Sequence, residues 1–378
     1  MSYKISFQKN QLGFLKSYLK VADKDFGRYL IVNLSKESDG KYMSFELSTK
    51  EVDVVTKLKN DSVEFDSGTE MSLTFPLSDF YNFVSLLSDD ESVTLADSIF
   101  KTKKGEYPIR ELSQEIARQS IVSLVDNAFT SIKLTQLEKL KILKGFIGSD
   151  IKGQDAILFQ GGNYSAFGES QACTVIGDGS DSEPVYLSPR MVEVLDMIDS
   201  ESVTLNLQKT QNIIVIRHDD TIYFFKVNKK YKVPDLMSDT FKSRWLHDYP
   251  VKVKFNDFLN VLNKFKVLSS DESIKLLYKF KLENGNMMIQ TMNNQSGSAF
   301  ESIEAVIPDE LNGLEFPLSV GHTLTALKAF NPKVTENIYM YLKPYDETKA
   351  VKWVSSFGVR DMADEKVLVV LPTLSQMM

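Results

Sequence analysis

Residues that could carry catalysis or hold a metal ion are few in this chain. The 378 residues include three histidines, His218, His247 and His322, and a single cysteine, Cys173. The histidines are not spaced as metal-ligand pairs, and Cys173 lies in no recognisable nucleophile motif. The acidic stretch GDGSDSE at 177–183 lacks the ligand spacing and the closing glutamate of a calcium-binding loop. We therefore expect no catalytic residue, no metal site, no cofactor and no enzymatic activity.

The lysines have a more informative spacing. Lys9, Lys16 and Lys20 lie on one face of a predicted helix, opposite three leucines of the same segment. Six segments have the apolar spacing of short helices: 9–21, 78–88, 135–147, 188–199, 256–268 and 320–333. Together they carry a net charge of +5, whereas the whole chain carries −7 and the remainder therefore −12. An electrostatic channel for nucleic-acid phosphates in an acidic protein would show this asymmetry, although by itself the pattern favours lysines on solvated helix faces.

The candidate DNA-contacting residues all lie on these predicted helices. They are Lys9, Lys16, Lys20, Lys139, Lys141, Lys144, Arg190, Lys264, Lys266 and Lys328. The segments 78–88 and 188–199 are net acidic, so we do not expect every helix to contact DNA. The alternative is that the lysines occupy solvated helix faces, as lysines do in most proteins.

The elements that carry these lysines belong to an internal repeat. The pentapeptide ESVTL occurs at 91–95 and at 201–205, each time after Leu-Ser, an apolar run at helical spacing and an acidic turn. A third copy of this segment opens at Phe316 with FPLS, as the first copy does at Phe75. A second series alternates with the first and begins at Lys4, Ser131 and Val251. Each copy passes from alternating apolar residues to a helical period and then to strand-like runs.

The repeat divides the chain into three homologous α+β domains. We expect them at 1–124, 125–247 and 248–378, each with two units of strand, short helix and further strands. A content of 43% hydrophobic and 25% charged residues is typical of globular proteins. We expect neither a signal peptide nor a membrane-spanning segment, and the single cysteine fits a reducing cytoplasm.

Three stretches carry a resemblance to a known family. They are LSPRMVEVLDMIDSESVTLNLQ from Leu187, VPDL from Val233 and VLVVLPTLSQMM from Val367. Together with the three-fold repeat, they resemble the DNA polymerase sliding clamps of the three-domain bacterial beta type, phage-encoded relatives included. The resemblance covers essentially the whole chain. It implies three DNA-clamp domains that form half of a six-domain ring, closed by a head-to-tail homodimer.

The same resemblance implies a function and partners. A clamp of this type encircles double-stranded DNA without reading its sequence and tethers the replicative DNA polymerase to the template. It has no catalysis of its own, and an ATP-driven clamp loader opens it. These partners imply a cytoplasmic, nucleoid-associated protein of a bacterial or phage-infected cell. The alternative is a clamp-fold scaffold that binds replication or repair partners without encircling DNA.

The resemblance also implies a groove for a partner's hydrophobic peptide between the second and third domains. Its residues in this chain would be Gly179, Pro234, Val369, Val370, Leu371, Pro372 and Thr373. The stretch GDGSD keeps only the Asp-Gly of the family's groove loop, which suggests that the groove accepts a different peptide. The alternative is that 367–371 is simply a buried final strand.

A dimer seam is the last site that the resemblance implies. Val267 and Leu268 would face the first domain of the other subunit, at Ile99 and Lys101. We expect an edge strand of the first domain near 99–103, because pairing across the seam would protect an open edge. The alternative is that Val267 and Leu268 end a buried helix stripe.

Overall fold

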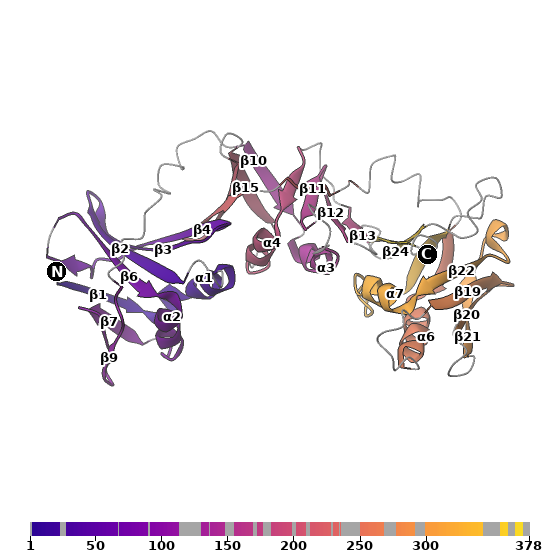
Figure 1. The fold of residues 1–378 in the computed structure, drawn as a ribbon, viewed down its shortest axis with the longest axis horizontal. Helices are drawn as coiled ribbons and strands as arrows, with labels where there is room; N and C mark the ends of the chain where they lie inside the picture. The colour runs from indigo at the N-terminus through magenta and orange to yellow at the C-terminus, as the bar shows by residue number, and fades with distance from the viewer. Residues whose placement is uncertain are drawn as a thin grey trace. The chain divides into compact units, whose positions relative to one another are not determined.

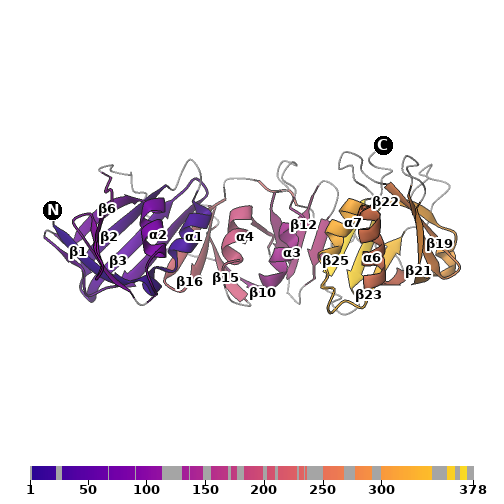
Figure 2. The same ribbon diagram turned by 90° about the horizontal axis from the view of Figure 1, so that it is seen from below.

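The computed structural model describes residues 2–372, with gaps. The residues outside the description within that range are 23–27, 67, 90, 113–129, 136, 148–154, 169–171, 177–182, 199–201, 209–211, 228–229, 234, 236–249, 268–276, 292–298, 343–355 and 362–366. The chain forms two compact units, Met1–Leu137 with Arg190–Lys230 and Glu138–Pro189 with Tyr231–Met378. Figure 1 and Figure 2 show the helices and strands of each unit.

The first unit contains two antiparallel sheets. The five-stranded sheet has the order β5 (Glu64–Phe65), β1 (Tyr3–Gln8), β7 (Ser92–Ala96), β8 (Ile99–Lys101) and β9 (Glu106–Pro108). The eight-stranded sheet has the order β10 (Thr130–Thr135), β15 (Ser202–Gln208), β16 (Ile213–His218), β17 (Thr221–Lys226), β4 (Val52–Lys59), β3 (Gly40–Ser48), β2 (Tyr29–Glu37) and β6 (Glu70–Pro76). Strand β17 pairs with β4, from Thr221 opposite Thr56 to Phe225 opposite Val52. One sheet therefore continues from the predicted first domain into the predicted second domain.

Short helices pack against the strands of the first unit. They are η1 (Lys9–Leu12), α1 (Leu15–Val21), α2 (Leu77–Ser85) and α4 (Pro189–Leu195). Helices α1 and α2 lie side by side on the same face of the sheet that contains β2 and β3 (Figure 2). Leu77, Phe80 and Val84 of α2 are buried, at the spacing of one helix face. Phe80 packs edge to face against Phe100 of β8, with ring centroids 5.2 Å apart.

The helix expected over 9–21 is two segments in the structure. The 3₁₀ segment η1 ends at Leu12 and α1 begins at Leu15, so Gly13 and Phe14 separate them. Gly13 and Phe14 both have right-handed helical dihedral angles, so the two segments are joined by a helical turn and not by an extended break. Helix α1 itself is seven residues long.

The second unit contains a twelve-stranded antiparallel sheet. Its order is β14 (Val185–Leu187), β11 (Ile157–Gln160), β12 (Asn163–Phe167), β13 (Ala172–Val175), β25 (Val367–Pro372), β24 (Ser356–Asp361), β23 (Asn337–Leu342), β18 (Pro250–Lys254), β21 (Phe300–Val306), β20 (Asn286–Thr291), β19 (Leu277–Glu283) and β22 (Glu315–Ser319). Its helical segments are η3 (Leu137–Lys139), α3 (Leu140–Lys144), α6 (Phe255–Val267), η5 (Asp309–Leu311) and α7 (Val320–Leu327). Helices α6 and α7 lie side by side (Figure 2), and Phe258 of α6 is buried against Phe280 of β19.

The two ESVTL copies begin equivalent strands, as the repeat predicts. Strand β7 begins at Ser92 and pairs with β1, and β15 begins at Ser202 and pairs with β10. The third copy follows the same rule, because β23 pairs with β18. The mixed α+β fold built from a repeated unit is therefore confirmed. Among the described helices, none is long and apolar enough to cross a membrane.

Candidate nucleic-acid interface

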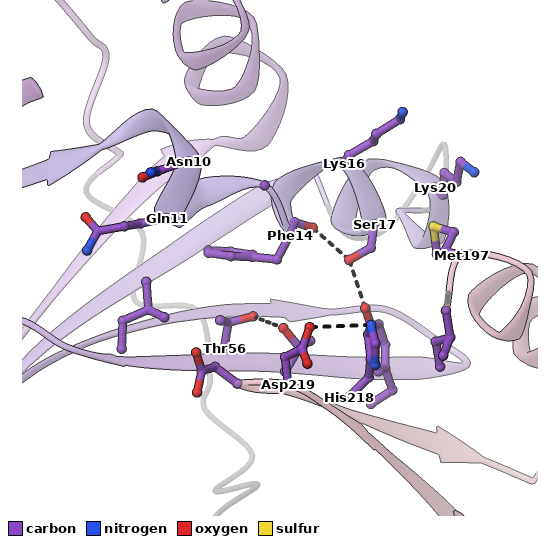
Figure 3. Close-up of a pocket in the computed structure, with 16 residues that line it drawn as sticks. Asn10, Gln11, Phe14, Lys16, Ser17, Lys20, Thr56, Met197, His218 and Asp219 are labelled. Atoms are coloured by element: carbon purple, nitrogen blue, oxygen red, sulfur yellow. Dashed lines mark hydrogen bonds and ion pairs between the residues drawn. The ribbon is translucent and has the colours of Figure 1, made fainter. Parts of the chain in front are cut away.

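Helix α1 presents two free cations to solvent. Its buried stripe consists of Leu15, Tyr18 and Val21, which turns the side chains of Lys16 and Lys20 outward. Both lysines are exposed, and Figure 3 shows them pointing away from the strands beneath the helix. Within the described part of the chain, neither ammonium group has an ion-pair partner. These two groups are available to an anionic ligand.

Lys9 has a different environment. Its Nζ donates to the carbonyl oxygen of Leu87 at 2.5 Å and lies 3.1 Å from Oδ1 of Asp89. Only 26% of the side chain is exposed. Lys9 therefore fastens η1 to the turn that follows α2, and its charge is already matched within the chain.

Arg190, at the start of α4, is also engaged. Its Nη1 lies 2.9 Å from Oε2 of Glu193 and donates to the backbone carbonyl of Lys20 at 3.0 Å. That carbonyl belongs to the last turn of α1, where carbonyl groups lack intrahelical partners. A cation is favourable there because the C-terminal end of a helix carries partial negative charge.

The second unit presents its cations on α3, α6 and the residue after α7. Lys144 and Lys328 are exposed, and so are Lys141 and Lys266. The side chain of Lys139 lies outside the described residues. Lys264 differs from these, because its Nζ lies 2.5 Å from Oε1 of Glu301 in β21.

A cavity of about 540 Å³ lies beneath α1, between the helix and the ends of β4 and β17 (Figure 3). Tyr223 crosses it, and its Oη donates to Oγ of Ser17 at 2.9 Å. Burial raises the pKa of Tyr223, so the hydroxyl remains a donor at neutral pH. On the same side, Nε2 of His218 lies 3.5 Å from a carboxylate oxygen of Asp219.

The side chains that could hold a metal ion are the histidines, the cysteine and the acidic residues. No group of three or more histidine, cysteine or acidic side chains among them could hold a metal ion. Cys173 is buried in β13. His247 and residues 177–182 lie outside the description, as does the side chain of His322.

The expected peptide groove is described only in its backbone. Gly179, Pro234 and Thr373 lie outside the described residues, as do the side chains of β25. That strand contains the other four predicted positions, Val369, Val370, Leu371 and Pro372. Its register with β13 runs from Ala172 opposite Val370 to Val175 opposite Val367. Leu371 and Pro372 therefore follow the last residue of β25 that pairs with β13 and lie near Ala172, the first residue of β13. Val175, the last residue of β13, lies at the opposite end of the pair.

The expected dimer-seam residues lie on two elements. Val267, the last residue of α6, has 82% of its surface exposed and so is not part of that helix's buried stripe. Leu268 lies outside the described residues. Ile99 and Lys101 lie in β8, which pairs with β7 on one side and β9 on the other. The expectation of an edge strand at 99–103 is therefore wrong, because β9 is the edge.

Sequence reasoning missed a second open edge, on β21. This strand pairs with β20 along most of its length, but on its other side only Ala305 and Val306 pair with β18. Phe300 and Val306 are 63% and 65% exposed. The alternation of FESIEAV could have identified the exposed face, but the missing neighbour could not be read from the sequence.

Comparison with known proteins is informative at the level of structure. No protein-family model and no curated protein sequence matches the chain. The crystal structure of the DNA polymerase sliding clamp from Pseudomonas aeruginosa with ligand matches with a TM-score of 0.75 and 15% identity, covering 98% of this chain and 99% of that one. The sliding clamp from Caulobacter crescentus gives 0.74 and 16%, with 98% and 99% covered. A Pseudomonas aeruginosa clamp, DNA polymerase III subunit beta bound to griselimycin, gives 0.73 and 16%, with 99% of each chain covered.

Proposed function

Because the chain has the fold of the bacterial DNA polymerase sliding clamps over nearly its whole length, we propose that it is a sliding clamp itself. Two copies form a ring that encircles double-stranded DNA, and the ring tethers a DNA polymerase without catalysis of its own. A clamp loader driven by ATP opens the ring, in the cytoplasm and at the nucleoid. The observation that carries the proposal is the match of the complete repeated fold, which a fragment or a single domain would not give.

The exposed lysines support the DNA contact. A protein that slides must bind phosphates and avoid base edges, since base contacts would hold it at particular sequences. Lys16 and Lys20 of α1 are exposed and unpaired within the described residues, and Lys144 and Lys328 are exposed on the second unit. An acidic protein with free cations on its helices is suited to an electrostatic contact of this kind.

The internal repeat supports the ring. Strands β4, β13 and β21 occupy equivalent places, in the orders β6-β2-β3-β4, β14-β11-β12-β13 and β22-β19-β20-β21. Beyond them, β4 pairs with β17 and β13 pairs with β25, which are the last strands of the second and third predicted domains. The equivalent last strand of the first predicted domain is β9, an edge strand. We therefore propose that β21 of one copy pairs with β9 of a second copy, and that two such seams close the ring.

The same reasoning refines the proposed seam residues. Phe300 and Val306 of β21, together with Tyr107 of β9, are large hydrophobic residues exposed in the single chain. Exposed apolar side chains along an unpaired strand edge favour association and would otherwise invite aggregation. Val267 and Lys101 lie on neighbouring elements and would border this seam.

The end of β25 is the proposed docking site for partner peptides. Val369, Val370, Leu371 and Pro372 form the apolar end of that strand beside β13, with Gly179, Pro234 and Thr373 as further proposed contacts. An apolar groove beside a strand end suits a short peptide, because a few anchoring side chains supply most of the binding energy. The polymerase and the clamp loader would compete for it.

A topological experiment tests the proposal. The protein is incubated with nicked circular DNA at low salt, the complex is isolated by gel filtration, and the DNA is then linearised. We expect the protein to stay with the circle in moderate salt, to leave linear DNA, and to be retained again when both ends are blocked by bound streptavidin. Equal retention on circular and linear DNA would contradict encirclement and favour the scaffold alternative.

A further inference from the structure

Helix α1 is too short to define its own position. It has seven residues, and isolated helices of fewer than about 12 residues are marginal in water. Leu15, Tyr18 and Val21 bury its apolar face, but a cavity lined by Lys16, Ser17 and Lys20 lies beside it. We therefore expect the orientation of Lys16 and Lys20 to depend on specific bonds to neighbouring elements as well as on this packing.

The first of these bonds comes from β17. Tyr223 donates to Oγ of Ser17 at 2.9 Å, and Ser17 Oγ donates in turn to the carbonyl oxygen of Phe14 at 2.7 Å. Figure 3 shows the dashed line between Ser17 and Phe14 on the helix side of the cavity, and both Ser17 and Tyr223 line that cavity. Tyr223 is 4% exposed, so the bond is shielded from competing water.

A second bond to the sheet acts one residue further along. The buried hydroxyl of Tyr18 donates to the carbonyl oxygen of Phe45 at 2.8 Å and lies 3.0 Å from Oγ1 of Thr56. Thr56 and Thr221 share a hydroxyl bond of 2.8 Å between β4 and β17. Tyr18 thus bonds from α1 to β3 and β4, and Tyr223 bonds from β17 to α1.

The third bond is at the C-terminal end of α1. Arg190 of α4 donates to the carbonyl oxygen of Lys20 and is oriented by Glu193. With 28% of its side chain exposed, the guanidinium is turned mainly toward the protein. Both bonds come from one nitrogen, Nη1, whose two N–H groups serve the carboxylate and the carbonyl together. A lysine side chain is one atom shorter, so we expect its ammonium not to reach the same two oxygens.

We propose that Arg190 and Tyr223 are positioning residues for DNA binding. Tyr223 holds α1 at the buried Ser17 and Arg190 holds it at its C-terminal turn, so that Lys16 and Lys20 are presented together, and neither positioning residue touches DNA itself. The consequence for DNA rests on the proposed clamp function, whereas the effect on α1 does not.

The substitution Arg190→Lys separates positioning from direct contact, because it keeps the positive charge. A phosphate contact would survive it. If Arg190 acts through α1, affinity for a fluorescein-labelled 30-base-pair duplex should fall about tenfold, the effect expected for losing one charge-assisted hydrogen bond. In a Lys16→Ala/Lys20→Ala background the same substitution should have no further effect. Wild-type affinity of Arg190→Lys, or an equal loss in both backgrounds, would overturn the proposal.

Amide hydrogen exchange tests the helix directly and needs no DNA. In Arg190→Lys and in Tyr223→Phe, the amides of α1 should exchange about tenfold faster than in the wild type. Tyr42→Phe is the matched control, because Tyr42 bonds Asp39 on a distant surface turn. Unchanged exchange of α1 in both variants would refute the positioning role. Faster exchange without any duplex binding by the wild type would support the hold on α1 and count against the proposed DNA function.

Discussion

A cation on a helix is available to a phosphate only if no group of its own chain already holds it. Lys9 lies against Asp89 and Lys264 against Glu301, so their charges are matched. Lys16 and Lys20 have no such partner within the described residues. Residues of one type on similar helices therefore differ in function, and the difference is decided by the acid that the fold places beside each one.

This difference predicts a measurable salt dependence. Each lysine that neutralises a phosphate adds about 0.9 to the slope of log affinity against log salt. Lys16→Ala/Lys20→Ala should therefore reduce the slope by about 1.8, whereas Lys9→Ala should leave it unchanged and lower stability instead. Fluorescence anisotropy with a labelled duplex, at salt concentrations from about 50 to about 200 mM, measures this slope.

Lys50→Ala, in the exposed turn between β3 and β4, is the control for a general loss of positive charge. A slope change in Lys9→Ala equal to that of one α1 lysine would contradict the assignment.

At the scale of elements, the pairing of β4 with β17 is reinforced by a buried ion pair. Oδ2 of Asp53 lies 2.8 Å from Nζ of Lys226, and Ser48 donates to the other carboxylate oxygen at 2.5 Å. The side chain of Asp53 is 4% exposed and that of Lys226 is 25% exposed. Lys226 also donates to the carbonyl oxygen of Thr49. The pair therefore adds a side-chain link between β17 and β4 to the backbone ladder from Thr221–Thr56 to Phe225–Val52.

Removing one partner should be costly. Asp53→Ala leaves Lys226 without its carboxylate, and we expect a loss of about 2–4 kcal/mol in the free energy of unfolding, at the low side because Lys226 is partly solvated. Glu37→Ala is the control, since it removes the exposed pair with Lys57 and should cost less than about 1 kcal/mol. Urea unfolding followed by circular dichroism measures both. Similar losses in the two variants would mean that the buried pair does not define this junction.

At the scale of the whole molecule, two open strand edges of the described residues occupy places where the equivalent strands of the chain are paired. Strand β9 ends the five-stranded sheet, and β21 is paired on its far side at only two residues. The two equivalent junctions within the chain bury both faces of their strands: Val52, Asp53 and Val54 in β4, and all of β13. On β21 every second residue is exposed or half-buried instead, as expected for a strand with one face in solvent.

A second copy of the chain is the neighbour that the proposal supplies. The wild type should therefore have twice the 42.9 kDa mass of one chain in solution. Phe300→Asp/Val306→Asp should convert it to a monomer, because two carboxylates would be buried at the seam. Val334→Asp is the control: Val334 is also 61% exposed but lies outside β21. Native mass spectrometry measures the mass of each assembly. A dimer that persists in the double variant would place the seam elsewhere.

The sequence by itself determined the repeat, the α+β class and the positions of six helical segments. These features are local, since they depend on hydrophobic period and on turns such as the one before each ESVTL. The sequence also indicated that the histidines and the cysteine lack the spacing of metal-binding and nucleophile motifs, because such motifs are defined by residue types and intervals.

Only the tertiary structure decided which strand is an edge and which lysine is free. The sequence placed an edge at 99–103, but pairing with residues 106–108 covers that strand. It also assigned Arg190 to DNA, although the fold brings the carbonyl of Lys20, 170 positions away, within 3.0 Å of it. Such contacts join segments far apart in the chain. Their geometry depends on how whole sheets pair, which no local pattern of residues records.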